Sequence, residues 1–324
     1  ILENKWSKGK FHSKFGSIDM DFSNYNYKTL NSSSFSNFVR KKLKKNKQIK
    51  LVNDTVLKIR EENNKLIVVG NKKNYKGKHV FDSRPNKRFK MESNNYTSLK
   101  QHFVGWVIRT KENKFNKDSF VFMDYRIRDK NNTAFTYVLP FKKNEALIEH
   151  TYFSKNEVEK KVYKNYIKKY IKEYYHTSDY EILKSESGVI PMTSYPFHED
   201  STKNITKIGS AGGWIKPSTG YSFKNCEKNS LKILYNIKNG KSLVISPKKK
   251  YKFLDKILLG VLSQFNRLGE IIFYNMIKKN KTVNVLRFLD EESNLLDEIN
   301  IIISVKKYKE FIKVFIQSLY KKAL

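Results

Sequence analysis

The sequence predicts a mixed α/β fold of the α+β kind, in which strands and helices concentrate in different regions, and three features of its pattern indicate this. Residues 101–151 alternate apolar and polar side chains with the period of two that strands show. Residues 222–324 repeat apolar side chains at helical spacing. Residues 205–221 form the most glycine-dense stretch of the chain and lie between a predicted strand and a predicted helix.

The first hundred residues are predicted to hold a helix followed by short strands. Ser34 precedes an apolar face at helical spacing that includes Phe35 and Phe38. Two β-rich runs with a polar turn between them follow, and a third strand ends in another polar turn. These segments are Ile49–Ile59, Lys65–Val69 and Val80–Pro85.

The middle of the chain is predicted to form an antiparallel meander whose two faces are both covered. Its clearest runs are Ser119–Arg126, Thr133–Pro140 and Glu145–Thr151. Strict alternation places Asp124 on the same face as Phe122. The same rule places Glu149 and His150 on opposite faces of their strand, and His150 is interpreted as structural.

The second half of the chain is predicted to be mainly helical. Ser154 and Glu157 form an S-x-x-E capping box, which predicts a helix that continues to about Tyr174. A strand is expected near Asp179–Ser185. The amphipathic stretch Tyr251–Leu268 fits an interfacial helix and a core helix equally well.

Composition excludes several classes of protein. Hydrophobic residues make up 39% of the 324 residues, which is too many for a disordered chain. No apolar run is long enough to span a membrane, and the first ten residues lack a signal-peptide core. The single cysteine, Cys226, excludes an internal disulfide framework, favours a reducing cytoplasmic setting, and gives no reason to expect a metal site.

The net charge of +34 raises the question of a nucleic-acid partner. The lysines are scattered in twos and threes, and no recognisable nucleic-acid module is present. We therefore expect no specific nucleic-acid partner. Most of the charge is interpreted as a solvated face, with a share of it attracting anionic lipid.

The glycine-rich segment Ile208–Phe223 reads IGSAGGWIKPSTGYSF. A strand end, a glycine turn, a proline and a second glycine before a helix make an arrangement that exposes backbone N–H groups to an anion or a ring edge. A turn with no ligand is the simpler interpretation of such a segment by itself.

This segment resembles the second flavin-contacting motif of lycopene cyclases, A-G-G-W/L-x-x-P-T/S-T-G-Y-S/T. Other segments resemble family motifs in the same order along the chain. They are Gln101–Trp106 (Q-x-F-x-G-W), Met123–Arg126 (M-D-[FWY]-R), Phe135–Pro140 (F-x-Y-x-L-P), Leu147–Thr151 (L-[IV]-E-x-T), Glu186–Met192 and Leu286–Leu289. The resemblance covers Trp6 to Leu289, and the ordered combination is specific.

The resemblance implies a two-layer fold like that of FAD-dependent oxidoreductases. The expected domains are a remnant of the FAD-binding domain (1–100), an antiparallel substrate-binding domain (101–186), an FAD-binding segment (187–240) and a helical C-terminal region (241–324). One departure is large, because the thirteen glycines include no G-x-G and hence no dinucleotide-binding fingerprint. The Rossmann-type unit is therefore expected to be incomplete, and the chain is expected to be an N-terminally truncated fragment.

The resemblance also implies an activity, the cyclisation of the ψ-ends of lycopene to β-ionone rings, which gives β-carotene by way of γ-carotene. This is an isomerisation of the intramolecular-lyase type with no net redox change, and it needs reduced FAD with NAD(P)H as the reductant. Lycopene is dissolved in the membrane. A cytoplasmic enzyme bound peripherally to the inner face of the cell membrane is therefore expected.

Residue roles follow from the same resemblance. Glu149 corresponds to the catalytic glutamate, and desolvation at the end of an apolar strand should raise its pKa enough to keep it protonated. Asp124 is a second carboxyl group, either a proton relay or the partner of Arg126 in an ion pair. The expected flavin contacts are Gly209, Gly212, Gly213, Trp214, Pro217, Thr219, Gly220, Tyr221 and Asp82. The expected substrate-lining residues are Trp106, Phe135 and Tyr137.

Three other interpretations stay open at this point. A related flavoprotein could reduce or hydroxylate an isoprenoid with the same fold. A basic module could bind lipid or nucleic acid without catalysis. An inert gene remnant would do neither.

Overall fold

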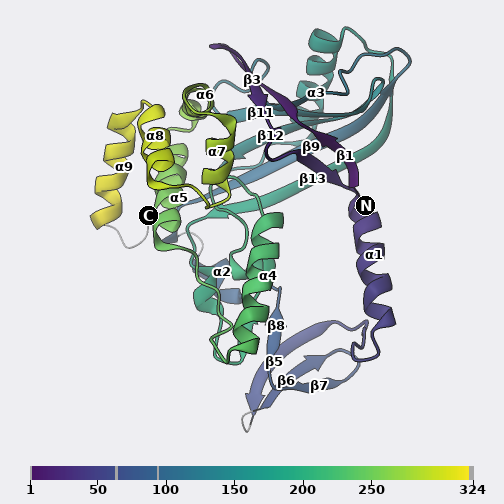
Figure 1. Ribbon diagram of the computed structural model, residues 1–324, viewed down its shortest axis with the longest axis vertical. Coiled ribbons are helices and arrows are strands. Elements are labelled where there is room, and N and C mark those ends of the chain that lie inside the picture. The colour runs from purple at the N-terminus through teal and green to yellow at the C-terminus, as the bar shows by residue number, and fades with distance from the viewer. Residues whose placement is uncertain (1, 63–64, 93–94, 321–324) are drawn as a thin grey trace.

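The computed structural model describes residues 2–62, 65–92 and 95–320, and it is a mixed α and β structure as predicted. One large sheet occupies the upper part of the molecule in Figure 1. The C-terminal helices lie beside it, and a small separate sheet lies at the opposite end of the molecule.

The large sheet has seven strands. In spatial order they are β13 (Tyr180–Thr193), β9 (Ser98–Thr110), β12 (Glu145–Ser154), β11 (Thr133–Lys142), β10 (Phe120–Asp124), β2 (Lys8–Ser13) and β3 (Gly16–Asp21). Neighbouring strands are antiparallel except for the parallel pair β10 and β2. The predicted antiparallel meander is therefore confirmed.

The expected domain boundary at residue 100 needs a correction. Strands β2 and β3 belong to the large sheet, so residues 8–21 are part of the same layer as residues 101–186. Phe11 and Met20 are buried in the core of this sheet. Local patterning did not reveal this, because pairing between segments about a hundred residues apart leaves no local signal in the sequence.

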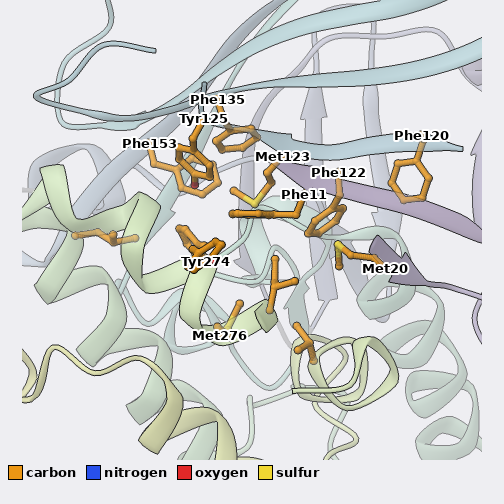
Figure 2. Close-up of a cluster of buried hydrophobic side chains, with 14 of the residues drawn as sticks. Phe11, Met20, Phe120, Phe122, Met123, Tyr125, Phe135, Phe153, Tyr274 and Met276 are labelled. Carbon is orange, nitrogen blue, oxygen red and sulfur yellow. The ribbon is translucent and has the colours of Figure 1, made fainter. Parts of the chain in front are cut away.

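Both faces of the large sheet are covered, as expected. Helix α3 (Lys160–Tyr175) covers one face and packs on a cluster that includes Trp106 and Ile148. The other face carries aromatic and methionine side chains that point toward Tyr274 and Met276 of α6, as Figure 2 shows. This second cluster joins the sheet to the C-terminal helices.

Helix α3 begins later than the capping-box motif predicts. Ser154 is still in β12, and its hydroxyl donates to the carbonyl oxygen of Asn156 at 2.7 Å. Glu157 forms an ion pair with Lys100 at 2.7 Å. Both motif residues are thus engaged elsewhere, and the predicted capping box does not form.

Helix α1 (Ser32–Lys45) confirms the predicted helix around Phe35, and the side chain of Asn31 caps it by accepting from the amide of Ser34 at 3.0 Å. Among its described residues none is buried. In the chain it lies between the β1–β4 pair and the three-stranded sheet of β5 (Val56–Glu62), β6 (Lys65–Gly70) and β7 (Asn74–Gly77), toward which it runs in Figure 1.

The remaining strands form two small pairs. Strand β1 (Leu2–Trp6) pairs antiparallel with β4 (Tyr27–Leu30). Strand β8 (Val80–Asp82) pairs parallel with β14 (Ile205–Lys207). The short helix α2 (Lys87–Glu92) follows β8 in the chain, and the 3-10 turn η2 (Phe197–Asp200) precedes β14.

The C-terminal region is helical, as predicted. Its elements are η3 (Gly209–Gly212), α4 (Phe223–Lys238), α5 (Lys249–Gln264), η4 (Asn266–Leu268), α6 (Gly269–Lys279), α7 (Thr282–Leu289), α8 (Leu295–Ser304) and α9 (Tyr308–Tyr320). Helix α5 buries Tyr251, Leu259 and Val261. Of the two interpretations of residues 251–268, the structure therefore shows the core helix.

Candidate active site

A cavity of about 170 Å³ lies between the large sheet and the C-terminal helices. Its walls are mostly aromatic and aliphatic, and among the described residues that line it Glu149 is the one carboxyl group. The lining residues are Tyr27, Gln101, Phe122, Met123, Phe135, Tyr137, Glu149, Thr151, Phe153, Ser218, Thr219, Tyr221, Phe273, Met276, Ile277 and Leu289. An apolar cavity with one acid suits a substrate without polar handles.

Glu149 lies in the middle of β12, is partly buried and lines the cavity. The hydroxyl of Thr151 donates to its Oε1 at 2.8 Å. Burial raises the pKa of Glu149 to about 7, and this effect outweighs the hydrogen bond from Thr151, which lowers it. A large share of molecules therefore carries the proton at neutral pH, as an acid catalyst requires.

His150 lies on the opposite face of the strand, as predicted. Its Nδ1 lies 3.0 Å from the hydroxyl of Thr136, and its ring stacks on Tyr166 of α3 with centroids 4.6 Å apart. Burial lowers the pKa of His150 to about 3, so the ring is neutral at physiological pH. The imidazole is a packed core group outside the cavity.

Gly105 of β9 separates Glu149 from Glu186 of β13, and the three residues are in register across the strands. A Cβ on Gly105 would lie 3.3 Å from Cβ of Glu149 and 3.2 Å from Cγ of Glu186. The glycine therefore leaves the room that the two longer side chains occupy. The negative charge of Glu186 adds to burial in raising the pKa of Glu149.

Asp124 lies outside this cavity. Its carboxylate accepts from Nε of Arg126 at 3.0 Å and from the hydroxyl of Tyr170 at 2.7 Å, and it is fully buried. Of the two roles considered for Asp124, the structure shows the ion pair with Arg126.

The expectation that Asp124 shares a face with Phe122 is wrong, because β10 contains a bulge. Between Val121 and Asp124 the strand gains one residue relative to β11. The extra residue turns Phe122 and Met123 toward the same core and sends Asp124 to the side of α3.

The predicted substrate-lining residues divide between the two faces of the sheet. Phe135 and Tyr137 line the cavity with Glu149. Trp106 does not, because it follows Gly105 directly and successive side chains of a strand point to opposite faces. It packs in the cluster under α3, so its expected role is corrected.

Three tyrosines line the cavity, and they are Tyr27, Tyr137 and Tyr221. Tyr137 is the direct neighbour of Glu149 on β11, and its hydroxyl bonds to that of Tyr27. Burial raises the pKa of Tyr27, Tyr137 and Tyr221, so all three are neutral donors or acceptors. Tyr27 escaped sequence reasoning because it belongs to β4, far from every recognised motif.

The glycine-rich segment bends through left-handed positions that glycine adopts readily. Gly209, Gly213 and Gly220 have φ values of +57°, +71° and +75°. At Gly220 an added Cβ would also collide with Oε1 of Gln101. The turn, and the start of α4 that follows it, therefore depend on these glycines.

This segment serves two cavities. Thr219 and Tyr221 reach the cavity of Glu149. A larger cavity of about 290 Å³ is lined by Gly212, Gly213, Trp214 and Pro217, among other residues. Neither Gly209 nor Gly220 lines either cavity.

Lys216 anchors the segment, and sequence reasoning missed it. The side chain of Lys216 is buried, and its Nζ lies 3.0 Å from Oδ1 of Asp255 on α5. The hydroxyl of Ser218 donates to the same carboxylate at 2.6 Å. This buried network fixes the turn against the core of the C-terminal helices.

Asp82, expected to contact the cofactor, is engaged by two cations. Its carboxylate accepts from Nε of Arg84 and from Nζ of Lys207, both at 2.8 Å. Burial works against the carboxylate, yet these hydrogen bonds lower the pKa of Asp82 to about 2. In this arrangement Asp82 holds β8 to β14.

The fold is shared with solved structures of low sequence identity. A geranylgeranyl bacteriochlorophyll reductase-like protein from Thermoplasma acidophilum is 12% identical, with 96% of this chain and 82% of that chain covered and a TM-score of 0.57. A flavoprotein/dehydrogenase from Cytophaga hutchinsonii is 10% identical, with 98% and 82% covered and a TM-score of 0.57. The flavin-dependent brominase Bmp2 is 11% identical, with 94% and 82% covered and the same TM-score.

These likenesses define the class of fold, which is that of flavin-dependent oxidoreductases and halogenases. No curated protein sequence matched the chain. The family model for lycopene cyclase proteins matches residues 1–305, and the chain belongs to that family. The family that the motifs implied is therefore confirmed.

Proposed function

We propose that this chain cyclises the ψ-ends of lycopene to β-ionone rings, producing β-carotene by way of γ-carotene in carotenoid biosynthesis. The observation that carries the proposal is the position of Glu149, a carboxyl group with a pKa of about 7 in the wall of an apolar, aromatic cavity. Membership of the lycopene cyclase family supports the same reaction.

The proposed chemistry begins with the neutral form of Glu149. Its proton adds to the terminal carbon–carbon double bond, and the π electrons of that bond form the new C–H bond. The resulting cation is attacked by the π electrons of a nearby double bond, which closes the six-membered ring. Loss of a ring proton to the carboxylate of Glu149 restores the acid, so protons and electrons balance without net oxidation or reduction.

The cavity wall serves the cation in two ways. The aromatic faces of Phe122, Phe135 and Tyr137 stabilise a cation by roughly 0.5–2 kcal/mol each. The apolar lining excludes water, which would otherwise capture the cation and give an alcohol. Glu149 is held by Thr151, so its proton is aimed from a fixed position in the strand.

A flavin fits the glycine-rich segment of this structure. An added Cβ at Gly209 would meet no described atom within 4 Å, so a planar group can approach the backbone there. The buried Nε1–H of Trp214 has no hydrogen-bond partner in the described part of the chain and is a donor for such a group. Reduced FAD, with NAD(P)H as its reductant, would supply an electron-rich ring whose negative charge stabilises a nearby cation.

The proposed substrate is dissolved in membranes, so we also propose a peripheral location on the inner face of the cell membrane, with no specific nucleic-acid partner. None of the helices that the structure describes has the length and hydropathy needed to cross a bilayer.

The test is anaerobic incubation of the chain with lycopene in detergent micelles, FAD and the NADPH that reduces it, followed by chromatography of the pigments. The expected products are γ-carotene and β-carotene without consumption of NADPH beyond the initial reduction. Stoichiometric consumption of NADPH with a hydrogenated or oxygenated product would replace this proposal with an isoprenoid reductase or hydroxylase.

A further inference from the structure

Helix α8 exposes most of its apolar residues and buries its acidic residues, which is the reverse of an ordinary surface helix. Five of its six apolar residues are exposed at the spacing of one helical face, and they are Leu295, Leu296, Ile299, Ile302 and Ile303, whereas Ile301 is buried. Its two acidic residues face inward, where Asp297 pairs with Arg287 at 3.0 Å and Glu298 pairs with Lys250 at 2.6 Å. A water-facing helix has the opposite distribution.

Helix α9 repeats this pattern directly after a short connection. Its exposed residues at the spacing of one face are Tyr308, Ile312, Phe315, Ile316 and Leu319. Val314 is buried in a cluster that it shares with Ile257 and Val261 of α5. The family match ends at residue 305, so α9 lies beyond the part of the chain that the family model describes.

Charge is also segregated in these two helices. The three acidic residues between 295 and 320 are Asp297, Glu298 and Glu310, and none of them is in the exposed class. Four lysines lie at the junction of the helices and along the edge of the exposed face of α9, and they are Lys306, Lys307, Lys309 and Lys313. Exposed apolar stripes with a cationic border are typical of helices that lie in the surface of an anionic bilayer.

We propose that the exposed apolar faces of α8 and α9 insert into the surface of an anionic lipid bilayer, with these four lysines contacting the lipid phosphates. The two helices are consecutive and lie together at the side of the molecule remote from the small sheet (Figure 1). Exposed aromatic side chains such as Tyr308 and Phe315 suit the headgroup level of a bilayer.

A second copy of the chain fits this surface less well than lipid. Two copies packed through it would bring the same lysines together at one interface, and each copy already carries a net charge of +34. A bilayer containing anionic lipid supplies both an apolar interior and the opposite charge. The proposal extends the peripheral location suggested above, and it holds independently of the cyclisation chemistry.

The test measures binding of the full chain to vesicles by co-sedimentation. The vesicles contain phosphatidylcholine, either alone or with phosphatidylglycerol. The altered variant carries Leu296→Gln and Ile303→Gln on α8 together with Ile312→Gln and Leu319→Gln on α9. We expect it to bind anionic vesicles at least about tenfold more weakly than the unaltered chain.

The matched control carries Leu231→Gln, Leu234→Gln, Tyr235→Gln and Ile237→Gln on α4. Leu231 is 61% exposed and Leu296 is 72% exposed, so the two variants remove comparable apolar surface from different places. The control should bind vesicles as the unaltered chain does. Lys309→Gln combined with Lys313→Gln should weaken the preference for phosphatidylglycerol, and circular dichroism checks the folding of each variant.

Several outcomes overturn the proposal. The unaltered chain fails to bind anionic vesicles, or the α8–α9 variant binds them as well as the α4 control does. If light scattering instead shows a dimer that the α8–α9 variant converts to a monomer, and no vesicle binding is seen, the surface joins two copies.

Cyclisation in micelles is measured separately, so failure of either proposal is visible without the other. Normal vesicle binding with no cyclic product rejects the catalytic role alone. Normal cyclisation in micelles with no vesicle binding rejects the lipid surface alone.

Discussion

Glu149 and Glu186 flank Gly105 in register, so two carboxyl groups on alternate strands face the same side of the sheet with only a glycine between them. They differ in environment. Glu149 opens on the cavity, whereas Glu186 lies on the edge strand with 36% of its side chain exposed. Burial and the neighbouring charge both favour the protonated form of Glu149. Glu149 is thus the carboxyl group that faces the cavity, and Glu186 is the one that faces solvent.

Removing the carboxyl group that faces the cavity should abolish cyclisation. Glu149→Gln keeps the shape of the side chain and removes the proton donor, so the initial rate should fall by about 10²–10⁴-fold. Glu186→Gln is the control, since it makes the same chemical change on the adjoining side of Gly105. The control should keep most of the activity in the micelle assay. An unimpaired rate for Glu149→Gln would remove this residue from the mechanism.

The rate should depend on pH through the same residue. The active form is the protonated one, so the rate should be high below pH 7 and fall as pH rises through the pKa of Glu149, which is about 7. In Glu186→Gln the midpoint should move to lower pH, because a nearby negative charge that raises this pKa is gone. A pH profile of the initial rate checks both statements, and a midpoint that moves upward would contradict the second.

Stability should also depend on pH in a direction that Glu149 sets. The pKa of Glu149 rises from its ordinary value of 4.5 to about 7 on folding, so the folded state binds more protons between these values than the unfolded state does. The free energy of unfolding should therefore fall as pH rises from 4.5 to 7, by roughly 3 kcal/mol from this group. Urea unfolding at pH 5 and pH 8 measures it, and Glu149→Gln should flatten this part of the dependence.

The turn at Gly220 should not tolerate a side chain. Gly220→Ala adds a Cβ at a φ of +75° and against Oε1 of Gln101, so both strain and a collision result. Gly240→Ala is the matched control, because its φ is +60° but no described atom lies within 4 Å of an added Cβ. Both substitutions should destabilise the fold by about 1–3 kcal/mol through backbone strain.

The contact with Gln101 exists at Gly220 alone of the two, and the end of that flexible side chain must move to relieve it. Because Gln101 and Tyr221 line the cavity, Gly220→Ala should also lower the cyclisation rate, which Gly240→Ala should leave unchanged. Equal effects of the two substitutions on both stability and rate would contradict the contact with Gln101.

Asp124 should contribute to the stability of the fold and not to the cyclisation rate. Asp124→Asn removes the carboxylate partner of Arg126, and we expect a loss of about 2–3 kcal/mol in the free energy of unfolding. This loss is at or below the range usual for breaking a buried ion pair. The side chain of Arg126 is 31% exposed, so water can solvate its charge when the partner is removed. The cyclisation rate per folded molecule should be unchanged. Glu157→Gln, which breaks the exposed pair with Lys100, should leave stability almost unaltered.

Local patterns were sufficient to predict the placement of Glu149. Alternation along β12 placed Glu149 and His150 on opposite faces, and the apolar neighbours of Glu149 indicated its raised pKa, both as the structure shows. The same rule misplaced Asp124, because a bulge in β10 adds a residue that no local pattern reveals. Ser154 and Glu157 matched a capping motif, but besides its bond to Asn156 the hydroxyl of Ser154 lies 2.7 Å from Nε2 of His102, and Glu157 pairs with Lys100.

Contacts between segments that are far apart in the chain could not be predicted from local sequence patterns. Tyr27 enters the cavity from a strand pair near the start of the chain, and β2 joins the sheet beside β10. The ion pair of Lys216 with Asp255 joins a turn to a helix 39 residues later. The sequence predicted helices in this region, but it did not predict that the apolar faces of α8 and α9 are exposed, since a helical stripe does not say which side meets the protein.

The cavity of Glu149 is assembled from nearly the whole length of the chain, because its walls run from Tyr27 to Leu289. During synthesis the sheet strands leave the ribosome long before α6 and α7. The apolar face of the strands therefore stays exposed to water until these helices are made and can pack on it. A chain of this kind folds slowly and exposes aggregation-prone strands in the interval. Chaperone demand and expression temperature should therefore govern the yield of active protein more than the stability of the finished fold does.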